Sequence, residues 1–184
     1  LSNAEDFNIR GPALPGWSSV NILPELTRRA VVSVEQAAAQ KRPFLLYFAL
    51  TSPHYPVAPA PEFIGKSGAG EYGDFVVQTD WVVGQITDAL KRSGVADNTL
   101  IVLSSDNGGE RFSDNSPLAH HKSTLWEGGI RVPCLMRWPA KLPKGKVTSQ
   151  VGITMDLSAT FAAIAGAKPA ADRPFDGINL LPIL

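Results

Sequence analysis

The sequence predicts an α/β fold with a largely parallel sheet flanked by helices on both faces. Two kinds of segment alternate along its 184 residues. Short apolar runs at 44–50, 100–103 and 132–138 are typical of buried strands. Between and around them lie longer segments whose apolar residues recur at helical spacing. Because strands that alternate with helices favour parallel pairing, the order of these segments predicts the fold class.

The apolar spacing predicts three helices, and two of them end at a recognisable stop signal. The first covers residues 26–40. The second covers 72–90 and is followed by Gly94, and the third covers 156–165 and is followed by Gly166. Glycine just beyond a helical segment favours the left-handed turn that closes a helix. These three helices supply the layers that we expect on the faces of the sheet.

The predicted strands are bounded by residues that favour turns. Run 44–50 lies between Pro43 and Ser52-Pro53, and run 100–103 follows the turn at Asp97-Asn98. The third run ends at Trp138. We expect Trp138 and Trp126 to be packing residues.

Composition excludes several classes of function. Lys and Arg total 17, as do Asp and Glu, so the formal net charge is zero and nothing indicates a nucleic-acid surface. No apolar run is long enough to span a membrane. A single cysteine excludes an internal disulfide framework and leaves the cellular compartment open. The length suits one domain with a hydrophobic core.

The strand at 100–103 ends in the polar sequence Ser104-Ser105-Asp106-Asn107-Gly108-Gly109. Open α/β sheets bind ligands at the carboxyl ends of their strands. A carboxylate beside an amide offers two oxygen ligands, which suit calcium better than zinc. The same residue types also favour an ordinary turn, and from these residues alone both interpretations stay open.

Further groups of residues join this turn in a fixed order. They are Tyr47-Phe48-Ala49-Leu50-Thr51-Ser52-Pro53-His54, Tyr72-Gly73-Asp74-Phe75, Asp80, Lys122, and Trp126-Glu127-Gly128-Gly129-Ile130-Arg131-Val132-Pro133. Each group is common alone, but their combination in this order is specific. From about Pro43 to Leu184 the sequence resembles the sulfatase family of the alkaline-phosphatase-like superfamily.

The resemblance implies an arylsulfatase-like sulfuric ester hydrolase that uses calcium and a formylglycine. In this family the formylglycine is made from the first residue of a Cys/Ser-x-Pro-Ser-Arg motif, which this sequence lacks; its only cysteine, Cys134, precedes leucine. We therefore expect residues 5–184 to be the later part of a sulfatase catalytic domain. That part lacks the N-terminal half with the nucleophile and the C-terminal subdomain, and we expect it to be inactive alone. Residues 1–4 resemble a tag remnant.

The resemblance also assigns site residues. Asp106 and Asn107 match the calcium ligands, Lys122 matches the lysine that contacts sulfate, and His54 matches the histidine near the leaving-group oxygen. Before Lys122 the sequence departs from the family with His120 and His121, which either contact substrate or are ordinary loop residues. Residues 127–129 either position the Lys122 loop or form a simple turn.

Two other functions remain open from the sequence. One is phosphoryl or phosphonate ester hydrolysis in the same superfamily, although relatives with two transition metals tend to place histidine where Asn107 stands. The other is a non-catalytic module that binds sulfate or glycans. The expected partners are a sulfate ester and the N-terminal half of the same protein. An unpaired sheet edge would also favour self-association.

Overall fold

The computed structural model describes residues 15–111 and 113–184. The chain divides into two compact units, residues 1–138 and 139–184, and each is described here by itself. The proposed tag remnant at residues 1–4 lies outside the described residues.

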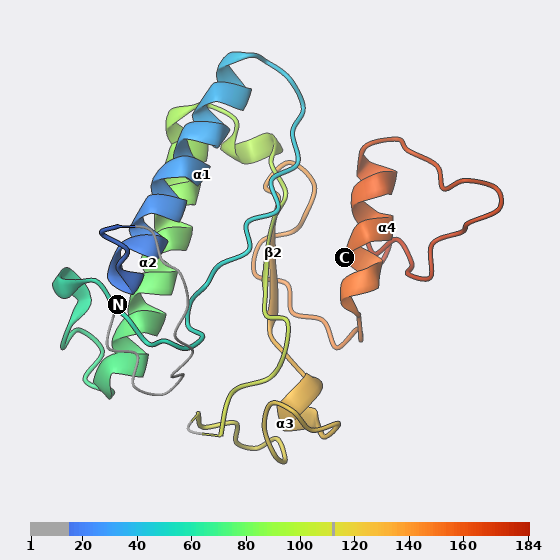
Figure 1. Cartoon of the computed structure of the whole chain (residues 1–184). Helices are drawn as coiled ribbons and strands as arrows, with labels where there is room; N and C mark the ends of the chain where they lie inside the picture. The colour runs from blue at the N-terminus through green and yellow to red at the C-terminus, as the bar shows by residue number, and fades with distance from the viewer. Residues whose placement is uncertain (1–14, 112) are drawn as a thin grey trace. The chain divides into compact units, whose positions relative to one another are not determined.

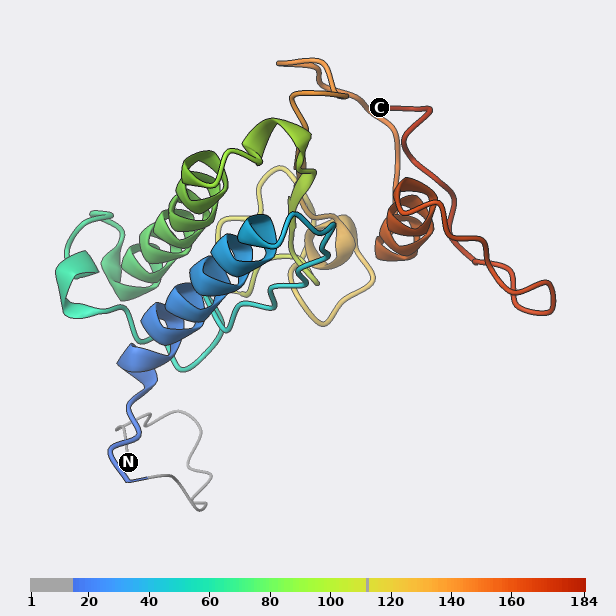
Figure 2. The same ribbon diagram turned by 90° about the horizontal axis from the view of Figure 1, so that it is seen from above.

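The first unit is built on two long helices that lie side by side, α1 (Ile22–Ala39) and α2 (Gly70–Arg92) (Figures 1 and 2). Short 3₁₀ turns precede α1 (Ser19–Asn21), precede α2 (Pro61–Phe63) and follow α2 (Ala96–Asn98). Two apolar clusters join the helices, one of Leu23, Phe75 and Val82 and one of Val34, Ala89 and Leu90. The prediction of both helices is confirmed.

The start of α1 differs from the prediction by four residues. The helix begins at Ile22, before Pro24, whereas the apolar pattern indicated a start at Leu26. Proline is tolerated in the first turn of a helix because the N–H groups there have no intrahelical acceptor. At the other end of the pair, α2 stops as expected, because Gly94 adopts a left-handed conformation (φ 69°).

The Tyr72–Phe75 motif organises the entry to α2. Buried Asp74 accepts hydrogen bonds from the backbone N–H groups of Gly65 (2.7 Å) and Ser67 (2.8 Å) and from the Ser67 hydroxyl (2.7 Å). These bonds, the Ser67 ones first, lower the pKa of the Asp74 carboxyl. Gly73 lies against the same loop, since a Cβ there would come within 2.6 Å of the Ser67 Oγ.

The sheet in the described residues has two antiparallel strands, β1 (Ile101–Ser104) and β2 (Cys134–Arg137). Ile101 pairs with Arg137, and Ser104 with Cys134. This corrects the expected parallel pairing, although the α/β class stands. A parallel pair needs a long crossover, usually a helix, to return the chain. In the described residues of this connection the four-residue helix α3 (Glu127–Ile130) is the only helix, so the chain turns back along β1.

The predicted strand at 44–50 is wrong for the described part of the chain, where this segment has no strand partner. Phe48 and Leu50 pack on the cluster of Leu23, Phe75 and Val82 instead. Leu45 and Tyr47 are 74% and 88% exposed. A strand forms only where a neighbouring backbone satisfies its N–H and C=O groups, which an apolar run cannot guarantee.

The second unit contains α4 (Thr154–Ile164), as the sequence predicts within two residues. Buried Asp156 accepts hydrogen bonds from the Ile153 and Ile178 N–H groups, which lower the pKa of its carboxyl. The Thr160 hydroxyl oxygen accepts from the Leu180 N–H (2.9 Å). These bonds fasten the segment at 177–180 to α4.

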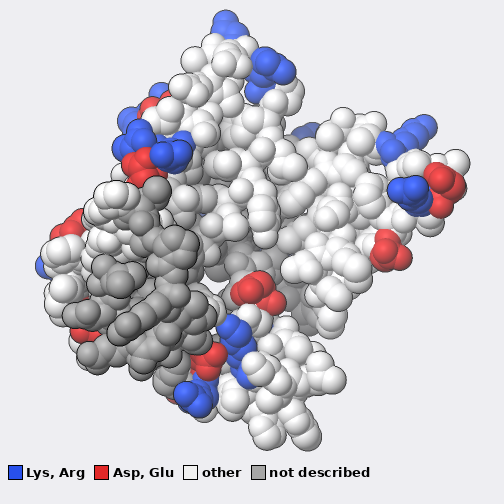
Figure 3. Space-filling model, in the orientation of Figure 1, with Lys and Arg blue, Asp and Glu red and all other residues white. Residues whose placement is uncertain are grey.

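Charged side chains of both signs share the surface. In Figure 3, acidic and basic side chains adjoin at the upper left, where Figure 1 shows α1. In α1 itself Glu25 forms ion pairs with Arg28 and Arg29, both at 2.7 Å. Among the helices of residues 15–111 and 113–184, none is long and apolar enough to cross a membrane.

Candidate active site

The first part of the candidate site is the turn that follows β1. The Ser105 hydroxyl donates to the Asn107 carbonyl (2.9 Å), and the Asn107 Nδ2 donates to the Gly108 carbonyl (2.9 Å). The amide nitrogen of Asn107 is thereby occupied. Within the described chain no hydrogen bond reaches the Asn107 Oδ1 or the carboxylate of exposed Asp106. The carboxylate of Asp106 and the Oδ1 of Asn107 therefore remain available to a ligand.

The chemistry of this pair suits calcium, because calcium prefers oxygen ligands, and carboxylate and side-chain amide oxygens are among those that it takes. The number of ligands falls short, since calcium takes about six to eight oxygens. No group of three or more His, Cys, Asp or Glu residues that could hold a metal occurs in the part of the chain that the structure describes. Asp106 and Asn107 thus fit part of a calcium site.

The second part of the candidate site, the loop at residues 119–124, is fastened directly to this turn. The backbone N–H of Lys122 donates to the Gly109 carbonyl (2.8 Å), and the N–H of Gly108 donates to the Gly129 carbonyl (2.9 Å). The structure therefore brings Lys122 together with the segment that carries Asp106 and Asn107.

Two glycine pairs make this contact possible. A Cβ at Gly108 would collide with the carbonyl oxygen of Gly128. A Cβ at Gly128 would collide with the carbonyl oxygen of His120, and one at Gly129 with that of Thr124. Gly128 also donates its N–H to the Ala119 carbonyl (2.8 Å). Of the two interpretations of residues 127–129, the contacts support positioning of the Lys122 loop over a simple turn.

The two histidines before Lys122 have different environments. His120 is exposed and adopts a left-handed backbone conformation (φ 63°), with its ring centroid 5.0 Å from that of Trp126. His121 places Nδ1 2.8 Å from the Lys122 carbonyl, which can only accept, so Nδ1 is the protonated nitrogen. Trp126 is 59% exposed here and is not the packing residue we expected, whereas Trp138 is buried.

His54 lies in a separate loop, and no hydrogen bond in the described residues joins it to Asp106, Asn107 or Lys122. The preceding loop is anchored to α2, because Thr79 Oγ1 donates to the buried Ser52 Oγ (2.7 Å). The Nδ1 of His54 lies 2.8 Å from the Tyr55 carbonyl and donates to it. Nε2 is therefore the nitrogen that remains for chemistry.

Cys134 does not resemble a nucleophile in this structure. It pairs with Ser104 in the sheet, and desolvation raises the pKa of its thiol.

Sequence reasoning missed Asn115, whose side chain contacts both halves of the candidate site. Its only sequence signal is the turn-forming run Asn115-Ser116-Pro117.

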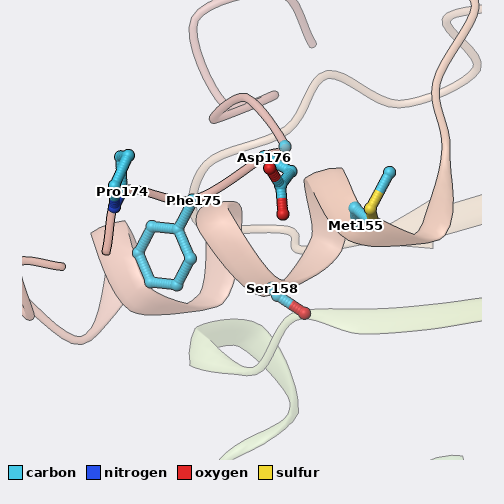
Figure 4. Close-up of a pocket in the computed structure, with 6 residues that line it drawn as sticks. Met155, Ser158, Pro174, Phe175 and Asp176 are labelled. Carbon is cyan, nitrogen blue, oxygen red and sulfur yellow. The ribbon is translucent and has the colours of Figure 1, made fainter. Parts of the chain in front are cut away.

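A small cavity of about 210 Å³ lies in the second unit. Figure 4 shows Met155 and Ser158 from α4 beside Phe175 and Asp176 from the segment that follows. None of the predicted site residues lines this cavity, so its size alone does not make it the candidate site.

Comparison with known proteins agrees with the motifs. The family model described as Sulfatase matches residues 18–167. Mouse N-acetylgalactosamine-6-sulfatase is 37% identical over 170 residues, which are 89% of this chain and 33% of the relative. Human arylsulfatase H is 39% identical over 155 residues, or 79% of this chain and 28% of the relative. The crystal structure of the PsFucS1 sulfatase from Pseudoalteromonas sp. aligns with a TM-score of 0.85 and 30% identity, covering 90% of this chain and 34% of that one.

This chain spans about a third of the length of these relatives. The family model covers most of the chain and includes β1, the Lys122 loop, α3 and β2. The chain belongs to the sulfatase family and forms a later portion of the sulfatase catalytic domain.

Proposed function

We propose that the full-length protein hydrolyses sulfate esters and that this chain supplies one half of its active site. The observation that carries the proposal is the 2.8 Å hydrogen bond from the Lys122 N–H to the Gly109 carbonyl. This backbone bond joins the residue that carries a cationic side chain to the segment that carries two side chains with oxygen ligands, Asp106 and Asn107. Membership of the sulfatase family supports the choice of sulfate as the group that these residues bind.

Lys122 is proposed to hold the sulfate group. A sulfate ester that is being cleaved gathers negative charge on its oxygens, and a fixed cation stabilises that charge most where it needs no reorganisation. The backbone contacts at Gly109 and Gly128 fix the loop, so only the flexible lysine stem must be ordered by the substrate. His120 and His121 are proposed to contact the rest of the substrate from the same loop.

His54 is proposed to protonate the leaving group. As the bond between sulfur and the ester oxygen breaks, the electron pair of that bond passes to the ester oxygen. The same oxygen takes the proton from Nε2 of the imidazolium. Nδ1 stays hydrogen-bonded to the Tyr55 carbonyl throughout, which fixes the ring. Histidine suits this step because its ordinary pKa lies close to neutral pH.

Calcium is proposed to bind between Asp106, Asn107 and ligands contributed by the rest of the protein. When bound, it would supply positive charge beside the sulfate oxygens. The nucleophile is proposed to be a formylglycine from the N-terminal part of the protein. Asp106 and Asn107 hold their side-chain oxygens at the end of β1, where the turn at Ser105 fixes the backbone.

The test uses the full-length protein with a chromogenic aryl sulfate and the matching aryl phosphate. We expect hydrolysis of the sulfate, and a loss of about 100-fold or more in kcat/KM for Lys122→Ala, through both KM and kcat. Lys141→Ala is the control, since Lys141 is exposed whereas Lys122 is half-buried, and Lys141 belongs to none of the segments of the candidate site; its activity should not change.

Three outcomes contradict the proposal in different ways. Preferential hydrolysis of the phosphate would favour a phosphoryl ester hydrolase. Binding of sulfated sugars without turnover would favour a binding module. Equal activity of Lys122→Ala and Lys141→Ala would remove Lys122 from the site. The names of the relatives include a sugar sulfatase and an arylsulfatase, so sulfated N-acetylgalactosamine should be assayed beside the aryl ester.

A further inference from the structure

We propose that Asn115 is a positioning residue that sets the distance between the Lys122 loop and the Asp106–Asn107 turn. This inference rests on the proposed function, since it assigns Asn115 a role in the same site. Asn115 is half-buried and lies seven residues before Lys122.

The side-chain amide of Asn115 joins the two halves of the site. Its Nδ2 donates to the Gly109 carbonyl and to the His120 carbonyl, each at 3.3 Å. Gly109 lies two residues after Asn107, and His120 lies two residues before Lys122. One NH₂ group, with its two hydrogens, therefore bridges the backbone on both sides of the contact.

The Gly109 carbonyl is the point where these bonds converge. It accepts from the Asn115 Nδ2 and also from the backbone N–H of Lys122 (2.8 Å). A carbonyl oxygen has two lone pairs, so both bonds can form together. The fit is close, because a Cβ at Gly109 would collide with the Asn115 Oδ1.

The bond to His120 restrains the loop at a conformation that a non-glycine residue rarely adopts. His120 has a φ of 63°, and its carbonyl oxygen lies between the Asn115 amide and the backbone of Gly128. Left-handed conformations are unfavourable for an L-residue because its Cβ comes close to the following carbonyl oxygen. Loss of the Asn115 bond would let this part of the loop relax and would move Lys122 from its place beside Gly109.

A purely structural asparagine predicts a different result from a positioning one. If Asn115 only stabilises the fold, its replacement lowers activity by the same factor whether or not Lys122 is present. If Asn115 acts by placing Lys122, its replacement costs little once the lysine side chain is gone. A double-mutant cycle separates these cases.

The experiment measures kcat/KM on an aryl sulfate for the full-length protein, Asn115→Ala, Lys122→Ala and the double variant. We expect Asn115→Ala to lose about 10- to 100-fold, since small displacements of a binding group have effects of this size. In the Lys122→Ala background the same change should cost less than about 2-fold. Equal losses in both backgrounds would overturn the inference.

Asn115→Asp provides a second test that leaves the packing almost unchanged. It preserves the volume beside Gly109 but replaces both donors with an oxygen that faces two carbonyl oxygens. Its loss should match or exceed that of Asn115→Ala, and wild-type activity would overturn the inference. Asn98→Asp is the matched control, because Asn98 is exposed, and its activity should not change.

The cycle also separates this inference from the proposed function. If Lys122→Ala keeps full activity, the site assignment itself is wrong and Asn115 has nothing to position. If Lys122→Ala is impaired and the two losses simply multiply, the proposed function stands and only the role of Asn115 is rejected.

Discussion

At the scale of single residues, the available atoms on His54 and Asn107 follow from their backbone neighbours. In both cases a local carbonyl oxygen accepts from one side-chain nitrogen, Nδ1 of His54 or Nδ2 of Asn107. The opposite atom, Nε2 of His54 or Oδ1 of Asn107, is then the one that remains available to a ligand. Short-range hydrogen bonds of this kind preorganise a site without any contact between its members.

His54→Ala tests the role of the imidazole as a proton donor in the full-length protein. Esters of poor leaving groups need protonation as the bond breaks, so their kcat should fall strongly. Esters of acidic phenols need little protonation and should lose much less. The measurement is kcat across phenyl sulfates of graded leaving-group pKa. An equal loss along the whole series would leave His54 a positioning role only.

At the scale of elements, the contact between the β1 turn and α3 depends on the absence of side chains. Gly128→Ala should destabilise the full-length protein by about 1–3 kcal/mol, because the new Cβ meets the backbone oxygens of His120 and Ala119. Gly84→Ala, in the interior of α2, meets nothing within 4 Å. It should stabilise the protein by about 0.5–1 kcal/mol through helix propensity.

Thermal or denaturant unfolding of the two alanine variants measures this difference. The substitution is the same in both, so intrinsic differences between glycine and alanine cannot explain opposite signs. Similar changes in stability at the two positions would contradict the close approach of α3 to the Lys122 loop.

The loop before α2 should make stability depend on pH through Asp74. Its hydrogen bonds to Ser67 and Gly65 lower the pKa of the folded-state carboxyl. The unfolded chain therefore binds this proton at a higher pH than the folded one. The stability that Asp74 contributes is full above its ordinary pKa of about 4 and is lost as pH falls through the lowered folded-state value.

Asp74→Asn should accordingly lower the melting temperature at about pH 6, and the difference from the unchanged protein should shrink below about pH 3. Asp97→Asn, at an exposed position, should change the melting temperature little at either pH. A difference in melting temperature between Asp74→Asn and the unchanged protein that stays constant from about pH 6 to below about pH 3 would contradict this role of the carboxylate charge.

Helices could be predicted from the sequence more closely than pairing between strands. Apolar spacing and Gly94 place α2, because helical hydrogen bonds are local and the buried stripe has a fixed period. Strand β1 also lies within one residue of its prediction. The segment at 44–50 and the direction of β2 were wrong, since both depend on which distant backbone lies alongside.

The candidate site shows the same division. Asp106, Asn107 and Lys122 carry chemistry that a motif can indicate, and their roles stay predictions. The contacts of Asn115 could not be predicted, because its short sequence run favours a turn in any context. Only the folded structure brings Gly109 and His120 within reach of one amide.

At the scale of the whole molecule, this chain is a portion of a larger catalytic domain. It spans 33% of the mouse relative and 34% of the PsFucS1 sulfatase. Exposed apolar side chains in the first unit include Leu45, Tyr47 and Leu135. An exposed apolar surface of this kind favours association with other protein molecules. We therefore keep self-association of the isolated chain as a prediction.

The central claim is that this chain holds one half of a sulfatase active site, with Asp106, Asn107, Lys122 and His54 in it. The most direct measurement compares hydrolysis of a chromogenic sulfate by the full-length protein and by the purified 184-residue chain. We expect turnover from the first and none above background from the second, because covalent catalysis requires a nucleophile. Clear turnover by the 184-residue chain that is lost in Lys122→Ala would contradict this account.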